Sequence, residues 1–174
     1  MSPYRPLSAL EMTVLGVILK RGPCVAYAIV CEFAGSATLA YRSGAGAIYP
    51  LLKRLANRGL LQLSAKKYTL TEAGTEALRN WVRPPFDAAS FSTNLDLLRA
   101  RAYFLKLLTP DEVRAFADSA VVGLAILLAE CRKTLEAQRA SGDRFGEFAM
   151  LGAVRETEAR IAWMNELPAT VGLH

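Results

Sequence analysis

The stretch Arg42–Leu61, RSGAGAIYPLLKRLANRGLL, predicts an amphipathic helix. Its apolar residues recur at the i, i+3, i+4, i+7 spacing of one helical face: Ile48, Leu51, Leu52 and Leu55. The other face is basic and carries an aromatic ring: Tyr49, Lys53, Arg54 and Arg58. Taken by itself, such a helix is an ordinary surface helix. Its surroundings in the chain favour a helix that is pressed against a negatively charged partner.

Two residues bear on where this helix begins and ends. Gly59 follows the last periodic residue, where a left-handed C-cap is expected. Pro50 falls inside the pattern, and proline is costly in a helix interior. Either Pro50 lies within the first turn, or the helix bends there.

A β-hairpin is expected directly after this helix. Leu61–Leu63 and Tyr68–Leu70 both alternate with period two, and Ser64–Lys67 lies between them. Lys66 and Lys67 would therefore stand at the tip of the hairpin.

Helices are expected on both sides of these elements. Ser8 can cap a helix of about Ala9–Lys20, with Glu11 at the capping-box position. A second short helix covers about Val25–Phe33, and Thr71 caps another helix after the hairpin. The order helix, helix, helix, hairpin, helix is that of a winged helix-turn-helix, whose third helix enters the major groove of DNA.

Pro84–Pro85 predicts a boundary between a domain of residues 1–85 and a domain of residues 86–174. The second domain reads as all-helical, so the fold class is α+β and mostly α. Its expected helices run from about residue 93 to 108, from Pro110 to about residue 140, and from Asp143 onward. The second of these is apolar over an arc too wide for one neighbouring helix, which predicts a homodimer.

The net charge of +5 is unevenly distributed. Residues 1–85 hold eleven Lys/Arg and four Asp/Glu, a net charge of +7, and residues 86–174 hold ten and twelve, a net charge of −2. A basic first half predicts a nucleic-acid or membrane-surface partner for that half. The most apolar run, Ala120–Ala129, is far shorter than the roughly 20 residues that a spanning helix needs.

The cysteines point to a cytoplasmic protein. Cys24, Cys31 and Cys131 form no CxxC pair, and no secretory leader opens the chain. Cys24 and Cys31 are interpreted as buried structural thiols, with a redox pair as the lesser alternative.

An enzyme is not expected. The single histidine, His174, is the last residue, which argues against His-based catalysis and His-based metal sites. Gly44 and Gly46 are not followed by the GK[ST] of a phosphate loop. We therefore expect no catalytic residue, no metal and no cofactor.

Binding to double-stranded DNA agrees better with the pattern. Phosphate contacts fix the register of such proteins on the duplex, and basic residues fall where they are needed, before the basic helix, on it and on the hairpin. Tyr49 could reach a phosphate or a base edge, or pack against the first helix. The predicted DNA-binding residues are Arg42, Ser43, Tyr49, Lys53, Arg54, Lys66 and Lys67.

Several of these segments resemble PadR-type transcriptional regulators. The resemblance rests on Leu15–Gly16, Gly22–Pro23, Tyr27, GAIYPLLKRLANRGLL at residues 46–61 and YTLTEAGTEAL at residues 68–78. It covers roughly residues 7–82. It implies a winged-helix DNA-binding domain, a helical dimerisation domain and, usually, repression relieved by an effector. The chain departs from the family in its short wing and at Ala47, where Ser or Thr is common.

Two further expectations follow. If a small-molecule effector controls the protein, an apolar or aromatic compound should bind near the junction of the two domains. The aromatic residues expected there are Trp81, Phe86, Phe91, Tyr103, Phe104, Phe116, Phe148 and Trp163, each of which could equally be core or dimer contact. The alternative function is a winged-helix protein–protein interaction module without DNA binding, which the short wing would favour.

Overall fold

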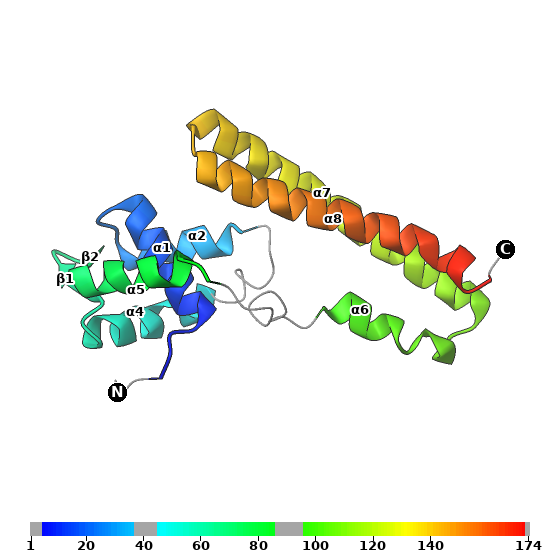
Figure 1. The fold of residues 1–174 in the computed structure, drawn as a ribbon, viewed down its shortest axis with the longest axis horizontal. Helices are drawn as coiled ribbons and strands as arrows, with labels where there is room; N and C mark the ends of the chain where they lie inside the picture. The colour runs from blue at the N-terminus through cyan, green and yellow to red at the C-terminus, as the bar shows by residue number, and fades with distance from the viewer. Residues whose placement is uncertain (1–4, 37–44, 86–95, 173–174) are drawn as a thin grey trace. The chain divides into compact units, whose positions relative to one another are not determined.

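A computed structural model describes residues 5–36, 45–85 and 96–172 of the chain. The chain divides into two compact units, Met1–Asp87 and Ala88–His174 (Figure 1). The elements of the first unit are α1 (Ala9–Arg21), α2 (Ala26–Ala34), the 3₁₀ turn η1 (Ala45–Ala47), α4 (Ile48–Asn57), β1 (Leu61–Ser64), β2 (Lys67–Leu70) and α5 (Glu72–Val82). Those of the second unit are α6 (Leu97–Ala102), the 3₁₀ turn η3 (Leu105–Leu107), α7 (Pro110–Ser141) and α8 (Arg144–Thr170).

Local capping signals set where the helices of the first unit begin. The Ser8 side chain accepts a hydrogen bond from the Glu11 backbone, and the Glu11 carboxylate accepts one from the Ser8 backbone, so the predicted capping box is present. The Thr71 side chain accepts from the Gly74 backbone and starts α5. Both starts lie where the sequence predicts them.

The third helix, α4, begins at Ile48, which places Pro50 in its first turn. The first of the two alternatives for Pro50 is therefore correct, because a first-turn residue needs no intrahelical N–H bond. At the other end Gly59 has a φ of +72°. The backbone N–H of Gly59 donates to Ala56, and that of Leu60 donates to Leu55, which is the Schellman ending expected of a glycine at this position.

The hairpin is antiparallel and pairs Leu61 with Leu70 and Ser64 with Lys67. Ser64 and Lys67 are thus the ends of the strands, and the connection is only two residues long. Cys24 forms an isolated bridge to Tyr68, with backbone N–O distances of 3.2 and 2.8 Å, so the segment before α2 adjoins the outer side of β2.

The core of the first unit lies among α1, α2, α4, α5 and the base of the hairpin. The apolar face of α4 predicted from its spacing is entirely buried there. Burying side chains of this size stabilises a fold by roughly 1.5–3 kcal/mol each. The buried apolar residues of this core are Val14, Leu15, Ile18, Cys24, Ile29, Phe33, Ile48, Leu51, Leu52, Leu55, Leu61 and Leu78.

The second unit is built on an antiparallel pair of long helices, α7 and α8 (Figure 1). Thr109 and Glu112 form a capping box with Pro110 at the first helical position, and Gly142 ends α7 in the left-handed conformation. Asp143 then caps α8 through the Gly146 backbone. One stripe of α7 is buried: Val113, Ala117, Leu124, Cys131 and Leu135.

The helix expected over residues 93–108 is wrong in its extent. Residues 93–95 lie outside the described part, and Asp96 caps α6, which ends at Ala102. The apolar residues from Tyr103 to Leu108 are too closely spaced to share one helical face, and the chain continues as η3. With these elements the predicted fold class, a winged helix with an all-helical C-terminal region, is confirmed. No helix in the described ranges combines the length and the apolar character that crossing a membrane requires.

Candidate nucleic-acid interface

Helix α4 presents a polar surface opposite its buried face. Tyr49 and Lys53 are one helical turn apart and both exposed, and the helix contains no acidic residue. Tyr49 is 56% exposed, so its ring is not part of the core beneath α4. Its side chain is accessible to a ligand, as a contact of Tyr49 with a phosphate or a base edge requires.

The hairpin carries its two lysines on the surface. Ala65 and Lys66 form the connection with φ values of +47° and +63°, the pair of left-handed residues of a type I′ turn. Lys66 and Lys67 are both exposed. In the described part of the chain neither ammonium group has an ion-pair partner, so both are available to an anion.

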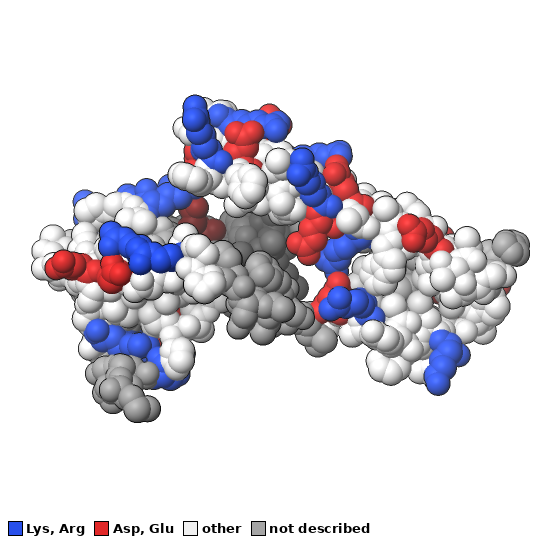
Figure 2. Space-filling view, in the orientation of Figure 1, with Lys and Arg blue, Asp and Glu red and all other residues white. Residues whose placement is uncertain are grey.

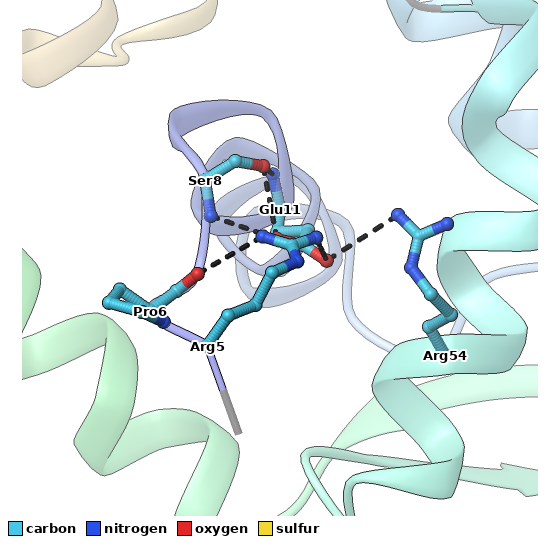
Figure 3. A network of polar contacts seen from close by, with 5 residues as sticks. All are labelled: Arg5, Pro6, Ser8, Glu11 and Arg54. Carbon is cyan, nitrogen blue, oxygen red and sulfur yellow. Dashed lines mark hydrogen bonds and ion pairs between the residues drawn. The ribbon is translucent and has the colours of Figure 1, made fainter. Parts of the chain in front are cut away.

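Arg54 is held by a carboxylate from another helix, which sequence spacing did not reveal. Its Nη2 lies 3.5 Å from Oε1 of Glu11, and Nη2 of Arg5 lies 2.9 Å from the same oxygen (Figure 3). The other oxygen, Oε2, accepts from the Ser8 backbone at 2.8 Å and the Ser8 hydroxyl at 3.0 Å. Glu11 is only 1% exposed, whereas Arg5 and Arg54 keep 58% and 54% of their side chains exposed.

This environment keeps Glu11 ionised. Burial acts to raise its pKa, but the Ser8 backbone, the Ser8 hydroxyl and Arg5 together hold the pKa of Glu11 below its usual value. The sequence identified Glu11 as a helix cap only. Its partners come from the N-terminal arm and from α4, and only tertiary packing brings them to one carboxylate.

A tyrosine and a cysteine on α2 are also exposed. A hydrogen bond between the two side chains raises the pKa of Tyr27. Cys31 is exposed, so the interpretation of Cys31 as a buried thiol is wrong; its position on α2 faces away from the core residues Ile29 and Phe33. Cys24 is buried as expected, and burial raises its pKa.

The remaining predicted residues fall into two groups. Arg42, Ser43, Phe86 and Phe91 lie outside the described residues. Of the aromatic side chains proposed for an effector, Trp81 on α5 is exposed, as are Tyr103, Phe104 and Phe148 in the second unit. Phe116 and Trp163 are half-buried in the second unit.

Acidic and basic side chains are distributed differently in the two units. In the view of Figure 2, Lys/Arg and Asp/Glu alternate closely over the long helices of the second unit. The second unit contains several ion pairs, such as Arg132 with Glu158 and Arg139 with Glu147. The exposed lysines of α4 and the hairpin lack such partners within the described ranges, which makes the first unit the better candidate for an anionic ligand.

Comparisons with known proteins agree with this geometry. Residues 14–80 match the model of the transcriptional regulator PadR-like family. The negative transcriptional regulator PadR of Bacillus subtilis (strain 168) is 23% identical over 184 residues, which cover 95% of this chain and 98% of the relative.

Two crystal structures of Bacillus subtilis PadR share the fold. The complex with operator DNA has a TM-score of 0.76 at 22% identity, covering 96% of this chain and 99% of that chain. The complex with p-coumaric acid has a TM-score of 0.76 at 23% identity, covering 97% and 98%. The family match over residues 14–80, the relative and the shared fold confirm the resemblance to PadR-type regulators read from the sequence.

Proposed function

We propose that the protein is a sequence-specific, double-stranded-DNA-binding transcriptional regulator, that it acts as a homodimeric repressor, and that a small aromatic or apolar effector controls it. The observation that carries this proposal is the exposed basic face of α4 beside the two lysines of the hairpin, in a PadR-like fold. The relative is a negative transcriptional regulator, and its structures hold operator DNA and p-coumaric acid. No enzymatic role is proposed, because the family is one of regulators. The expected location is the cytoplasm.

The proposed interface consists of Tyr49, Lys53 and Arg54 on α4 with Lys66 and Lys67 on the hairpin. Arg42 and Ser43, just before η1, belong to the same proposal. Residues 1–85 would bind DNA, and residues 86–174 would form the dimer and hold the effector. In a two-fold dimer each α4 would occupy a major groove, with half-sites about 34–36 Å apart.

Selection of bound duplexes from a random pool by the full chain tests the main claim. We expect enrichment of an inverted repeat, because a two-fold protein reads a two-fold site. No enrichment over input would contradict the proposal and favour the interaction module. The short two-residue turn of the hairpin is the observation on the side of that alternative.

The effector part is tested by fluorescence. The chain has two tryptophans, so Trp163→Phe leaves Trp81 as the single reporter and Trp81→Phe leaves Trp163. Titration with p-coumaric acid and other aromatic acids should quench one of them and should weaken binding to the selected duplex. Since only differential affinity for two states shifts an equilibrium, a compound that binds without changing DNA affinity would contradict effector control through this region.

A further inference from the structure

The buried carboxylate of Glu11 joins two segments that are far apart in the sequence. Arg5 belongs to the arm before α1, and Arg54 lies 43 positions after Glu11, on α4. Figure 3 shows the two guanidinium groups meeting at Glu11, one from each segment. Nη1 of Arg5 also donates to the Pro6 carbonyl at 3.0 Å, a contact within the arm itself.

The arrangement leaves both arginines able to bind something else. A guanidinium has five N–H donors, and each of these two groups uses only one on Glu11 in the described contacts. Both side chains remain more than half exposed. They are therefore positioned on one side and open to solvent on the other.

A small recess lies at this point. Its volume is about 240 Å³, and its lining consists of Arg5, Glu11, Arg54, Asn57 and Arg58. Three guanidinium groups against one carboxylate leave a net charge of about +2 around it. A planar guanidinium binds phosphate oxygens in a bidentate manner, so such a recess suits a phosphate group.

The position of Arg54 on α4 indicates that the phosphate belongs to the DNA backbone. Successive helical residues turn by about 100°, so Arg54 lies about 100° around the helix from Lys53, and Tyr49 lies on the far side of Lys53. Lys53 and Asn57 are then at the centre of the exposed face, and Arg54 is on its flank towards Glu11. When the centre of such a helix enters the major groove, its flanks meet the sugar–phosphate backbones.

We propose that Arg5 and Arg54, positioned by Glu11, form with Arg58 a phosphate clamp that binds one backbone phosphate of the DNA duplex entered by α4. Arg5 is thereby a DNA-contacting residue that lies outside both the third helix and the hairpin. Glu11 is a positioning residue that does not touch the DNA. This inference rests on the DNA binding proposed above and adds the N-terminal arm to the interface.

The competing interpretation is a purely structural ion pair that locks the arm and α4 to α1. A structural lock predicts that loss of Arg5 lowers stability and leaves the protein's contacts with DNA unchanged. A clamp predicts loss of one phosphate contact, which is visible in the salt dependence of binding. In a plot of log K against log[salt], each phosphate that the protein neutralises makes the slope steeper by about 0.9. The two interpretations therefore differ by about one unit in the slope expected for Arg5→Ala.

The experiment pairs protein variants with chemically neutralised phosphates. Duplexes selected by the full chain carry a methylphosphonate, which has no charge, at one backbone position at a time. Wild type, Arg5→Ala, Arg5→Lys and Glu11→Gln are titrated with each duplex at several salt concentrations. Glu112→Gln is the control, because Glu112 occupies the same place in an exposed capping box with Thr109.

We expect wild type to lose about threefold to tenfold in affinity when the clamped phosphate is neutralised. Arg5→Ala should show the same loss on the unmodified duplex, a salt slope lower by about one unit and no further loss at that one phosphate. Arg5→Lys should restore part of the slope, and Glu11→Gln should reduce the ratio of specific to random affinity. Glu112→Gln should match wild type.

Two results would overturn the clamp. One is an Arg5→Ala variant that is less stable to heat but keeps the wild-type salt slope. Such a variant would also lose as much affinity as wild type at every methylphosphonate position. The other is binding of inorganic phosphate to the free protein that is lost in Arg5→Ala, while the effect of each methylphosphonate on DNA affinity is the same in Arg5→Ala and wild type. The recess would then be a site for free anions. Failure of the proposed DNA binding can be distinguished from failure of the clamp, because wild type would then bind no duplex in the pool.

Discussion

The basic side chains on the surface of α4 differ in whether an ion pair fixes their direction. In the described part of the chain Lys53 has no ion-pair partner, whereas Arg54 shares Glu11 with Arg5. A free lysine is a mobile point charge, and a held arginine has a defined direction. We therefore expect Lys53 to contribute mainly affinity, and Arg54 to contribute register as well.

Replacing Lys53 with alanine should weaken binding to specific and to random duplexes by similar factors. The salt slope should fall by about one unit, because one phosphate contact is lost. Lys106→Ala, which removes an exposed lysine from the second unit, is the matched control and should leave the slope unchanged. Fluorescence anisotropy at several salt concentrations measures both variants. An unchanged slope for Lys53→Ala would remove Lys53 from the interface.

Glu11 predicts a particular dependence of stability on pH. Its pKa is lowered in the folded state, so the stabilisation is present above its ordinary value of about 4.5 and is lost as the pH falls through the folded-state value. Glu11→Gln should lower the free energy of unfolding at pH 7 by about 1–3 kcal/mol, because hydrogen bonds to a charged group are lost.

Urea unfolding between pH 7 and pH 3 checks this. The difference between wild type and Glu11→Gln should shrink as the pH falls below about 4.5. Glu112→Gln tests the exposed capping box, where hydrogen bonds from the Thr109 backbone and hydroxyl lower the pKa in the same direction. A difference for Glu11→Gln that stays constant down to pH 3 would show that the fold does not lower the pKa of Glu11.

At the scale of elements, the hairpin and α5 are joined by one very close approach. A Cβ added to Gly74 would fall on the carbonyl oxygen of Leu60 and would lie 3.3 Å from Cδ2 of Leu70. The Thr71 backbone N–H also donates to the Leu60 carbonyl at 3.2 Å. The start of α5 is thus seated directly on the base of the hairpin, which fixes the direction in which the wing leaves the core.

Gly74→Ala should therefore destabilise the first unit by about 1–3 kcal/mol, because backbone cannot move aside cheaply. Gly16→Ala is the matched control within α1, since a Cβ there meets nothing within 4 Å. That variant should be neutral or stabilising by up to about 1 kcal/mol, as alanine is the better helix former. Thermal unfolding measures both. Equal stability of the two variants would contradict the close approach.

At the scale of the whole molecule, α7 keeps large apolar side chains on the face away from its buried stripe. Val122 and Ile126 are one turn apart and are 62% and 64% exposed. The buried stripe of α7 faces α8, so these two side chains have no cover within the described part of the unit. A second copy of the chain, as in the proposed homodimer, would bury them.

Ile126→Glu should shift the protein from dimer to monomer at micromolar concentration, because a carboxylate at the centre of an apolar contact is costly to bury. Ala159→Glu introduces the same charge on an exposed position of α8 between two charged residues and should leave the dimer intact. Analytical ultracentrifugation of the full chain distinguishes them. A wild-type chain that is monomeric under these conditions would contradict the proposed dimer.

Several helix ends of this protein follow from residues that are close together in the sequence. The helix starts at Ser8 and Thr71 and the left-handed ending at Gly59 all lie where the sequence predicts them. Each depends on hydrogen bonds within one turn of backbone, so neighbouring residues contain the information. The buried face of α4 followed from its spacing for the same reason.

Contacts between residues that are far apart in the sequence could not be predicted in this way. The shared carboxylate of Arg5 and Arg54, the exposure of Cys31 and the contact of Gly74 with Leu60 depend on which elements pack together and at what distance. Periodicity predicts which face of a helix is buried, but not which partner covers it. The candidate interface was therefore predictable in its residue types, and the side chains that position it were not.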